Sequence, residues 1–206
     1  RAVLLDAGQT LLHTREPVGR TYARVAAAHG GITDEREIGR RFREAFAAPW
    51  EGLRYVGDGR PFWRRLVAHA IGTHDNDAFE ALYTHYEHPA AWKVADGAVD
   101  AIAEWRGRGL KVALVSNWDA RLRPLLVAMD LAARFDALAI SAEVGAEKPD
   151  PAIVHAALDA VGVAPEASLL VGDGRADREA AAAAGCRFVH FGSEVTHFAD
   201  LAAHLA

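Results

Sequence analysis

Residues 2–12 of the chain read AVLLDAGQTLL. The first four are apolar and Asp6 follows directly, which is the pattern of a buried strand that ends in a carboxylate. In open α/β sheets, ligands bind at the carboxyl ends of the strands. A carboxylate there can bind a cation or attack an electrophile. The small residues Ala7 and Gly8 then let the backbone approach a bound group closely.

The overall composition excludes several classes of protein. Apolar residues make up 51% of the 206 and charged residues 25%, as in ordinary soluble domains. The net charge of −5 gives no electrostatic reason to bind nucleic acid or an anionic membrane. No apolar run approaches the ~20 residues that span a bilayer. The single cysteine, Cys186, excludes an internal disulfide and fits a reducing compartment, so we expect a cytoplasmic protein.

Residues 18–92 contain apolar residues at helical spacing and no convincing strand. One helix is predicted over 18–29. A second follows Thr33, which is placed to cap it, and ends near residue 48. A third begins at Pro61, and a fourth covers 77–87. These four short helices, with aromatic residues on their faces, predict a small helical bundle.

After residue 92, continuous apolar strands alternate with helices. This alternation predicts a parallel sheet covered on both faces, and therefore an α/β protein. The first strand belongs to the same sheet, so residues 1–17 and 93–206 are expected to form one domain with residues 18–92 inserted in it. The predicted strands are 110–115, 137–140, 168–171 and 187–191, and the predicted helices are 97–108, 120–129, 151–161, 177–184 and 196–205.

Polar residues follow four of the predicted strands at the point where each strand ends. Taken singly, each has a structural interpretation, such as a helix cap or an acid in a first helical turn. Taken together, they place one group useful for phosphate chemistry in each of four loops at one end of one sheet. These residues are Asp6 and Thr10, then Ser116, Asn117 and Asp119, then Lys148, and finally Asp173 and Asp177.

The chemistry of phosphoryl transfer explains why these residue types occur together. The carboxylates of Asp6, Asp173 and Asp177 repel one another in one crevice, and carboxylate oxygens suit Mg²⁺. A cation and Lys148 neutralise the charge of a transferring phosphoryl group, and Ser116 with the N–H groups after it can bind the oxygens of that group. Asp6, in line with phosphorus, can then attack it and form an aspartyl-phosphate.

Four segments, in this order along the chain, resemble the four motifs of the haloacid dehalogenase superfamily of hydrolases, in the group whose helical cap follows the first motif. They are LDAGQTL at 5–11, VSN at 115–117, EKPDP at 147–151 and VGDGRAD at 171–177. Residues 116–122 and 141–145 further resemble the subgroup that includes haloacid dehalogenase-like hydrolase domain-containing protein 3.

The resemblance implies a Rossmann-like core with strand order 5-4-1-2-3 and an α-helical cap at residues 18–92. It implies that Mg²⁺ binds to Asp6, the Gly8 carbonyl and Asp173, with Asp177 in or behind that shell. The expected partner is a small phosphorylated metabolite, and the chain is expected to be a monomer or a homodimer. The expected site residues are Asp6 and Lys148 for catalysis, Thr10, Ser116, Asn117 and Lys148 for phosphate binding, and Asp6, Gly8, Asp173 and Asp177 for the metal.

Gly8 departs from the family pattern. Phosphatases that the chain resembles normally carry a second Asp there, which protonates the leaving oxygen and then activates water, a contribution of roughly 10²–10⁴-fold. Three outcomes stay open. The protein hydrolyses phosphates with good leaving groups, such as acyl or aryl phosphates; another residue replaces the acid, with His13, Asp119 and the cap loops as candidates; or the protein binds a phosphorylated ligand without turnover, as a silent or regulatory protein.

Two other reactions of the superfamily also proceed without the second Asp. Haloacid dehalogenases use no metal, whereas Asp173 and Asp177 together fit a cation site. Phosphonoacetaldehyde hydrolases depend on a cap lysine for a Schiff base, and residues 18–92 contain no lysine. The sequence therefore favours a Mg²⁺-dependent phosphatase, with a metal-free dehalogenase as the weaker alternative.

Overall fold

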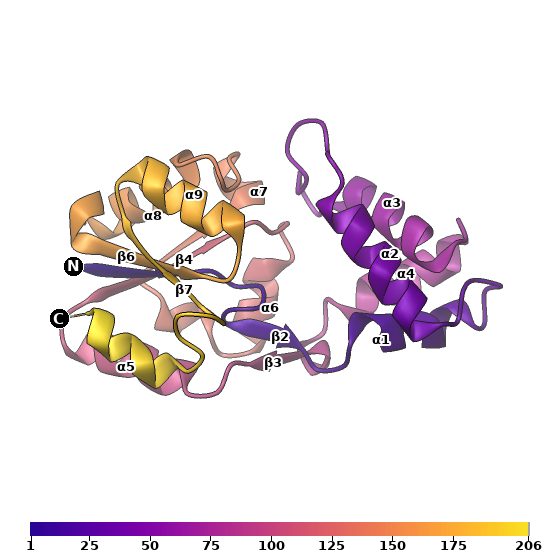
Figure 1. Cartoon of the computed structure of the whole chain (residues 1–206), viewed down its shortest axis with the longest axis horizontal. Coiled ribbons are helices and arrows are strands. Elements are labelled where there is room, and N and C mark those ends of the chain that lie inside the picture. The colour runs from indigo at the N-terminus through magenta and orange to yellow at the C-terminus, as the bar shows by residue number, and fades with distance from the viewer. Residues whose placement is uncertain (206) are drawn as a thin grey trace. The chain divides into compact units, whose positions relative to one another are not determined.

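The computed structural model describes residues 1–205 (Figure 1). The chain divides into two compact units. The core unit comprises Arg1–His13, Val56–Asp58 and the chain from Val94 onward, and the helical unit comprises Thr14–Tyr55 and Gly59–Lys93. The short segment Val56–Asp58 joins the core unit through a hydrogen bond from the Ala120 N–H to the Gly57 carbonyl, 2.8 Å long.

A five-stranded sheet forms the centre of the core unit. Its strands are β1 (Ala2–Leu5), β4 (Lys111–Ser116), β5 (Ala137–Ile140), β6 (Ser168–Gly172) and β7 (Arg187–His190), in the order β5-β4-β1-β6-β7. All neighbouring pairs are parallel. If these five strands are renumbered along the chain, the order read from one edge is 5-4-1-2-3. The predicted parallel α/β sheet and its strand order are confirmed.

Helices cover both faces of this sheet, because its strands are apolar on both sides. Figure 1 shows α8 (Ala152–Val161) and α9 (Arg175–Ala184) on one face and α5 (Ala98–Gly107) on the other. Ala2 and Leu4 of β1 pack with the α8 and α9 side. Side chains alternate along a strand, so Val3 and Leu5 face the α5 side. Both pairs are almost fully buried, and β1 is therefore fixed at the centre of the sheet.

Two predicted segments, residues 196–205 and the segment after residue 140, differ from the structure. Residues 196–205 were expected to form an α-helix, but the structure has the 3₁₀-helix η4 (Phe198–His204). Its buried residues Phe198 and Leu201 are three apart, which matches the three residues per turn of a 3₁₀-helix. The loop predicted after residue 140 begins with the short helix α7 (Ser141–Val144). The predicted helix 120–129 corresponds to α6 (Leu122–Ala128).

Two short strands were not predicted. β2 (Leu12–Thr14) and β3 (Trp92–Val94) form a separate two-stranded sheet, at two of the four points where the chain passes from one unit to the other. Three residues are too few to show a strand periodicity in sequence. The remaining elements are the 3₁₀ turns η1 (Pro89–Ala91), η2 (Ala132–Arg134) and η3 (Pro165–Ala167).

The helical unit contains the four helices that were predicted: α1 (Val18–Ala26), α2 (Glu35–Ala47), α3 (Arg60–Ile71) and α4 (Asn76–His85). One cap differs, because the carboxylate of Asp34, not Thr33, accepts the hydrogen bond from the Glu37 N–H. Helices α1 and α2 touch closely at Gly19, where a Cβ atom would lie 2.1 Å from the Glu35 carbonyl oxygen. Among residues 1–205, no helix has both the length and the apolar composition needed to cross a membrane.

Candidate active site

Asp6 lies at the carboxyl edge of the sheet, directly after the central strand β1. The register aligns Leu5 with Leu114 of β4 and with Val171 of β6. The Asp6 N–H continues the ladder by donating to the Val171 carbonyl, 2.9 Å away. Neighbouring strands therefore flank Asp6 on both sides, and only 7% of the residue is exposed. The backbone that carries this carboxylate is held firmly in the sheet.

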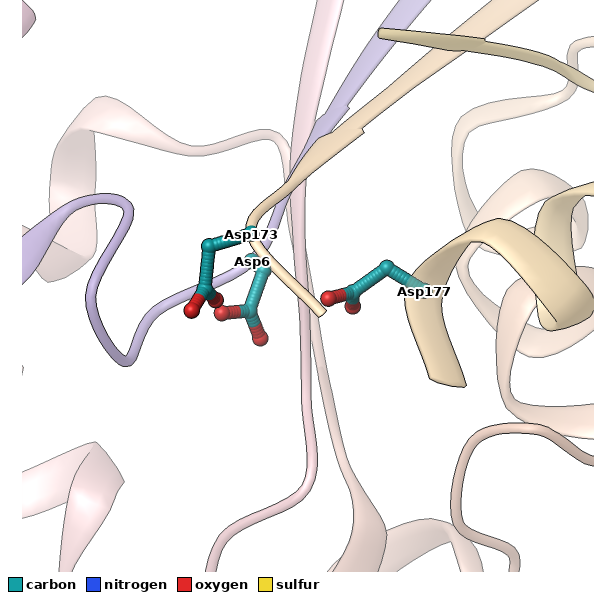
Figure 2. A group of neighbouring side chains, drawn as sticks. All are labelled: Asp6, Asp173 and Asp177. Atoms are coloured by element: carbon teal, nitrogen blue, oxygen red, sulfur yellow. The ribbon is translucent and has the colours of Figure 1, made fainter. Parts of the chain in front are cut away.

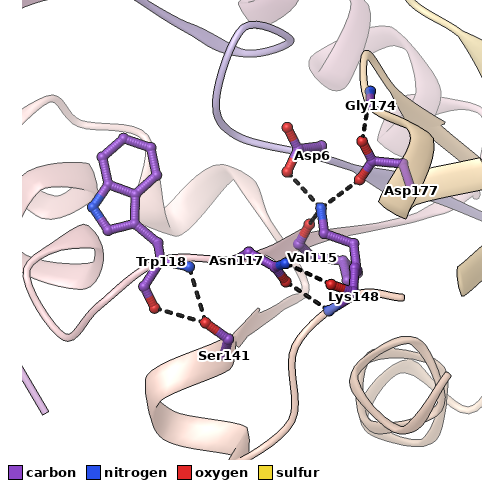
Figure 3. A network of polar contacts seen from close by, with 8 residues as sticks. All are labelled: Asp6, Val115, Asn117, Trp118, Ser141, Lys148, Gly174 and Asp177. Atoms are coloured by element: carbon purple, nitrogen blue, oxygen red, sulfur yellow. Dashed lines mark hydrogen bonds and ion pairs between the residues drawn. The ribbon is translucent and has the colours of Figure 1, made fainter. Parts of the chain in front are cut away.

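The ammonium of Lys148 lies against Asp6 (Figure 3). Its Nζ donates to Asp6 Oδ1 at 2.6 Å, to Asp177 Oδ1 at 2.5 Å and to the Val115 carbonyl at 2.9 Å. An ammonium has three hydrogens, so all of them are used. Burial alone would lower the pKa of Lys148, but the charges of Asp6 and Asp177 outweigh burial and raise it. Lys148 is therefore charged at neutral pH.

Asn117 holds the backbone of Lys148 in place. Its side-chain amide donates to the Lys148 carbonyl at 2.8 Å and accepts from the Lys148 N–H at 2.7 Å. The peptide bond that follows, Lys148–Pro149, is cis. Asn117 comes directly after β4, so it fixes the Lys148 loop to the end of a strand. The side chain of Asn117 therefore positions Lys148, and the phosphate contact expected of Asn117 through its backbone N–H stays a prediction.

Three carboxylates converge at the same edge. Each of Asp6, Asp173 and Asp177 offers one oxygen, and these oxygens lie within 4.8 Å of one another. Figure 2 shows that the three side chains point toward a common centre from the end of β1, the loop after β6 and the first turn of α9. Asp177 Oδ2 also accepts a 2.9 Å hydrogen bond from the Gly174 N–H.

Gly172 makes room for the Asp177 carboxylate. A Cβ atom at position 172 would lie 2.5 Å from Asp177 Cγ, closer than real contacts allow. The end of β6 therefore has to be a glycine for Asp177 to reach Lys148. Sequence reasoning did not assign this role, although the signal was present in a glycine that separates an apolar strand from the two acids.

The carboxylates carry more negative charge than Lys148 offsets. Burial raises the pKa of Asp6 to about 7; Lys148 opposes this shift and the charge of Asp177 adds to it. Burial, followed by the charge of Asp177, also raises the pKa of Asp173. Raised carboxyl pKa values indicate a site that would gain from a bound cation. Oxygen donors with excess negative charge are the set that Mg²⁺ prefers, so these residues fit that ion.

Ser116 and Thr10, two of the predicted phosphate-binding residues, are both buried at this edge. Ser116 is the last residue of β4. Thr10 has 0% exposure, and its hydroxyl has no hydrogen-bond partner among residues 1–205. An unpaired buried hydroxyl costs about 1–3 kcal/mol. The phosphate contact expected of Thr10 stays a prediction, since its hydroxyl is closed off from solvent in this structure.

Asp119 is not the replacement acid that the sequence left open. Its carboxylate binds Arg121 in a two-pronged ion pair, with Nε–Oδ1 at 2.9 Å and Nη2–Oδ2 at 2.8 Å. It also accepts from the Arg121 N–H, and its exposure is 0%. Both oxygens of this carboxylate therefore accept hydrogen bonds from Arg121. His13, the other named candidate, lies on β2, outside the four loops that carry the site residues.

Trp118 lies beside Gly8 and was not singled out by sequence reasoning. An ideal Cβ atom on Gly8 would lie 3.9 Å from Cζ3 of the Trp118 ring. The only signal in the sequence was an aromatic residue directly after the Ser116-Asn117 pair. Gln9 next to Gly8 has a φ of 58°, in the left-handed region that glycine usually occupies.

The chain matches a family of known proteins over most of its length. Residues 1–185 match the family model described as haloacid dehalogenase-like hydrolase. The chain belongs to this family. This haloacid dehalogenase-like hydrolase is 36% identical over 185 residues to haloacid dehalogenase-like hydrolase domain-containing protein 3 of Homo sapiens, covering 84% of the chain and 74% of that protein. It is also 33% identical to a phosphoserine phosphatase of Thermus thermophilus over an alignment of 218 positions. This alignment covers 92% of the chain and 87% of that protein.

Solved structures share the fold of this haloacid dehalogenase-like hydrolase. A HAD phosphatase from Thermococcus onnurineus matches with a TM-score of 0.72 at 22% identity, over 100% of this chain and 98% of that one. A dehalogenase with an intermediate complex matches with a TM-score of 0.77 at 20% identity, over 100% and 97%. The predicted superfamily, the fold class and the place of the chain in a hydrolase family are confirmed.

Proposed function

We propose that this haloacid dehalogenase-like hydrolase is a Mg²⁺-dependent phosphatase of small phosphorylated metabolites that works through an aspartyl-phosphate on Asp6. The observation that carries the proposal is the buried contact between Lys148 and Asp6, with Asp173 and Asp177 beside it. A carboxylate kept close to a fixed positive charge is suited to attack an electron-poor centre. The phosphoserine phosphatase among the relatives supports a phosphoryl substrate.

Each residue then has a defined task. Asp6 attacks phosphorus, and Lys148 orients Asp6 and favours its ionised form. Ser116, at the end of β4, is placed to donate to a phosphoryl oxygen. Asp173, Asp177 and the Gly8 carbonyl would hold Mg²⁺ together with Asp6. When bound, Mg²⁺ supplies positive charge that offsets the charge on the phosphoryl group, and such neutralisation with correct positioning provides most of the catalysis in phosphoryl transfer.

The proposed setting follows from the same features. A small phosphorylated metabolite is the proposed partner, because the charge centre at Asp6 and Lys148 is compact and almost fully buried. The cytoplasm is the proposed location, since the single cysteine fits a reducing compartment. A monomer or a homodimer is the proposed state.

The alternative function is that of a catalytically silent binding or regulatory protein, which binds a phosphorylated ligand without hydrolysing it. The observation that favours it is Gly8, which leaves the site without the acid that phosphatases of the family normally use. This alternative predicts ligand binding with no turnover across a broad panel of metabolites. A metal-free dehalogenase instead predicts halide release that a chelator does not change.

Hydrolysis of an activated aryl phosphate tests the proposal. We expect turnover to require Mg²⁺, to stop on addition of a chelator and to be lost in Asp6→Asn. Asp159→Asn is the matched control, because Asp159 is exposed on α8, away from the sheet edge, and should keep full activity. Full activity in Asp6→Asn, or turnover that persists without the metal, would contradict the proposed mechanism.

A further inference from the structure

We infer that this hydrolase is selective for phosphates whose leaving group departs as a stable anion, such as acyl and aryl phosphates. The reason is that Gly8 supplies no proton donor and that the Trp118 ring lies next to this position. The inference rests on the proposed function and names its substrate class. It depends on three observations: what stands beside Gly8, which groups near Asp6 hold a proton to give, and where the electrons go when the bond breaks.

A ring carbon is the one heavy atom that lies within 4 Å of an ideal Cβ on Gly8, apart from its chain neighbours, among the described residues. The Trp118 ring atom nearest to an ideal Cβ on Gly8 is Cζ3, at 3.9 Å, and a ring carbon donates no proton to a leaving oxygen. Trp118 is fixed by Ser141, whose Oγ accepts from the Trp118 N–H and donates to the Trp118 carbonyl, both at 3.0 Å (Figure 3). These two bonds hold the backbone that carries the Trp118 ring.

Asp173, which lies beside Asp6, belongs to the carboxylates that would hold Mg²⁺. Three further ionisable groups at this edge of the sheet are committed to other bonds. Lys148 uses its three hydrogens on Asp6, Asp177 and the Val115 carbonyl. Asp177 accepts from Lys148 with one oxygen and from the Gly174 N–H with the other. Asp119 is paired with Arg121 through both oxygens. None of these groups is placed to protonate a departing oxygen.

The first chemical step, transfer of the phosphoryl group to Asp6, determines the selectivity. A bond forms between an Asp6 oxygen and phosphorus, the bond from phosphorus to the leaving oxygen breaks, and its electron pair stays on that oxygen. The leaving group departs as an anion without taking a proton from the protein. The barrier therefore rises with the basicity of that anion, and carboxylates and acidic phenolates leave fastest.

The second step loses the same assistance. Water attacks phosphorus, the bond from phosphorus to Asp6 breaks, the electron pair returns to the carboxylate, and the water's proton leaves with the phosphate or passes to solvent. With no base to take that proton, the attack of water is slow. The aspartyl-phosphate should then accumulate, and the first turnover should release a burst of phenolate close to the enzyme concentration.

A leaving-group series tests the inference. We would measure kcat/KM with Mg²⁺ for aryl phosphates from strongly acidified nitrophenols to phenol itself, whose pKa is about 10, as for tyrosine. The expected result is a steep fall in kcat/KM as the phenol becomes more basic. In Gly8→Asp, kcat/KM for phenyl phosphate should rise by about 10²-fold, the typical gain from a positioned acid, with little change for the most acidic phenol.

The structure accepts this variant and provides its control. The 3.9 Å distance from the added Cβ atom to Trp118 is an ordinary contact, and the φ angle of Gly8 is not positive, so a side chain there causes no backbone strain. Gly8→Asn adds a side chain of the same size that gives no proton, so it should keep the steep wild-type dependence. A rise for phenyl phosphate in Gly8→Asn equal to that in Gly8→Asp would overturn the proton-donor explanation.

The outcomes separate the inference from the proposed function. If turnover requires Asp6 and Mg²⁺ but kcat/KM is flat across the phenols, the selectivity is wrong and the proposed function stands. If turnover survives in Asp6→Asn, or no aryl phosphate is hydrolysed at all, the proposed function fails and the selectivity fails with it. A steep dependence with a phenolate burst in wild type, lost in Asp6→Asn, is the result that we expect.

Discussion

The charge balance around Lys148 decides what each acid at the sheet edge can do. One buried ammonium faces two carboxylates at hydrogen-bond distance, and Asp173 adds a third negative group nearby. Removing one partner of a buried ion pair typically costs about 3–5 kcal/mol, because the other charge is left unpaired. The position of Asp177 is therefore critical, and it depends on the absence of a side chain at Gly172.

Gly172→Ala tests this dependence. The added methyl group would lie 2.5 Å from Asp177 Cγ, so Asp177 has to move away from Lys148. We expect Mg²⁺-dependent activity to fall by at least about 10²-fold, the scale on which one misplaced catalytic contact acts. Gly107→Ala is the control, since nothing lies within 4 Å of a Cβ there. Wild-type kinetics in Gly172→Ala would show that Asp177 needs no fixed position.

At the scale of residues, the sequence was informative wherever an apolar run ended. Asp6, Lys148, Asp173 and Asp177 could all be predicted, because strand ends of a parallel sheet meet at one edge. The clamp between Asn117 and Lys148 could not, because it joins positions 31 apart through the conformation of a loop. The pairing of Asp119 with Arg121 was also hidden, since two residues that follow a strand have no spacing rule.

At the scale of elements, the approach of α1 to α2 is the tightest helix contact at any glycine of the helical unit. It occurs where Gly19 meets the backbone of Glu35 at the start of α2. Aromatic contacts continue it, with the rings of Tyr22 and Phe42 at 5.6 Å between centroids in an edge-to-face arrangement. The four helices therefore owe their packing to one small residue as well as to their apolar faces.

Matched glycine substitutions test the packing of α1 on α2. Gly19→Ala places a Cβ atom 2.1 Å from a carbonyl oxygen, so we expect a loss of about 1–3 kcal/mol in the free energy of unfolding, as for overpacked cores. Gly39→Ala, on α2, meets only the flexible end of Arg43 at 3.5 Å and should gain about 0.5–1 kcal/mol from helix propensity. Denaturant unfolding measures both, and equal effects would contradict the packing described.

Most strands and helices of the core could be predicted, because apolar strands alternate there with segments of helical spacing. β2 and β3 could not, since three residues carry no period. The end of the chain was predicted as the wrong type of helix. An Ala-rich segment reads as α-helix by propensity, whereas the burial of Phe198 and Leu201 follows a 3₁₀ spacing.

At the scale of the whole molecule, the chain builds one charged centre into a sheet that is apolar on both faces. The parallel sheet could be predicted from the alternation of strands and helices, but its strand order came from the resemblance to a family. Apolar patterns do not say which strands are neighbours. The division into two units was visible as a change of pattern near residue 92, while the return of Val56–Asp58 to the core unit had no sequence signal.

Magnesium should stabilise the folded protein in a way that depends on pH. Without metal, burial raises the pKa of Asp6 to about 7, so the folded state binds more protons than the unfolded state from about pH 4 to 7. This group's contribution to stability therefore falls as pH rises through that window. Mg²⁺ needs the ionised carboxylate, so its effect on Tm should be small near about pH 5 and larger near about pH 8.

The size of this effect can be bounded. Free Mg²⁺ at about 100 times its Kd would add about 2.7 kcal/mol to the free energy of unfolding. Asp173→Asn should remove most of the increase in Tm, and Asp159→Asn, exposed on α8, should keep it. An increase of the same size at both pH values, or one that Asp173→Asn leaves intact, would argue against binding at the three carboxylates.

Transfer of the phosphoryl group to Asp6 is the central claim, and rapid acid quenching tests it most directly. Wild-type enzyme turning over an aryl phosphate with Mg²⁺ would be quenched, digested and examined by mass spectrometry. The peptide that contains Asp6 should carry the added mass of one phosphoryl group, and the same peptide from Asp6→Asn should not. Turnover with no phosphorylated peptide, or with the phosphoryl group on another residue, would contradict the account.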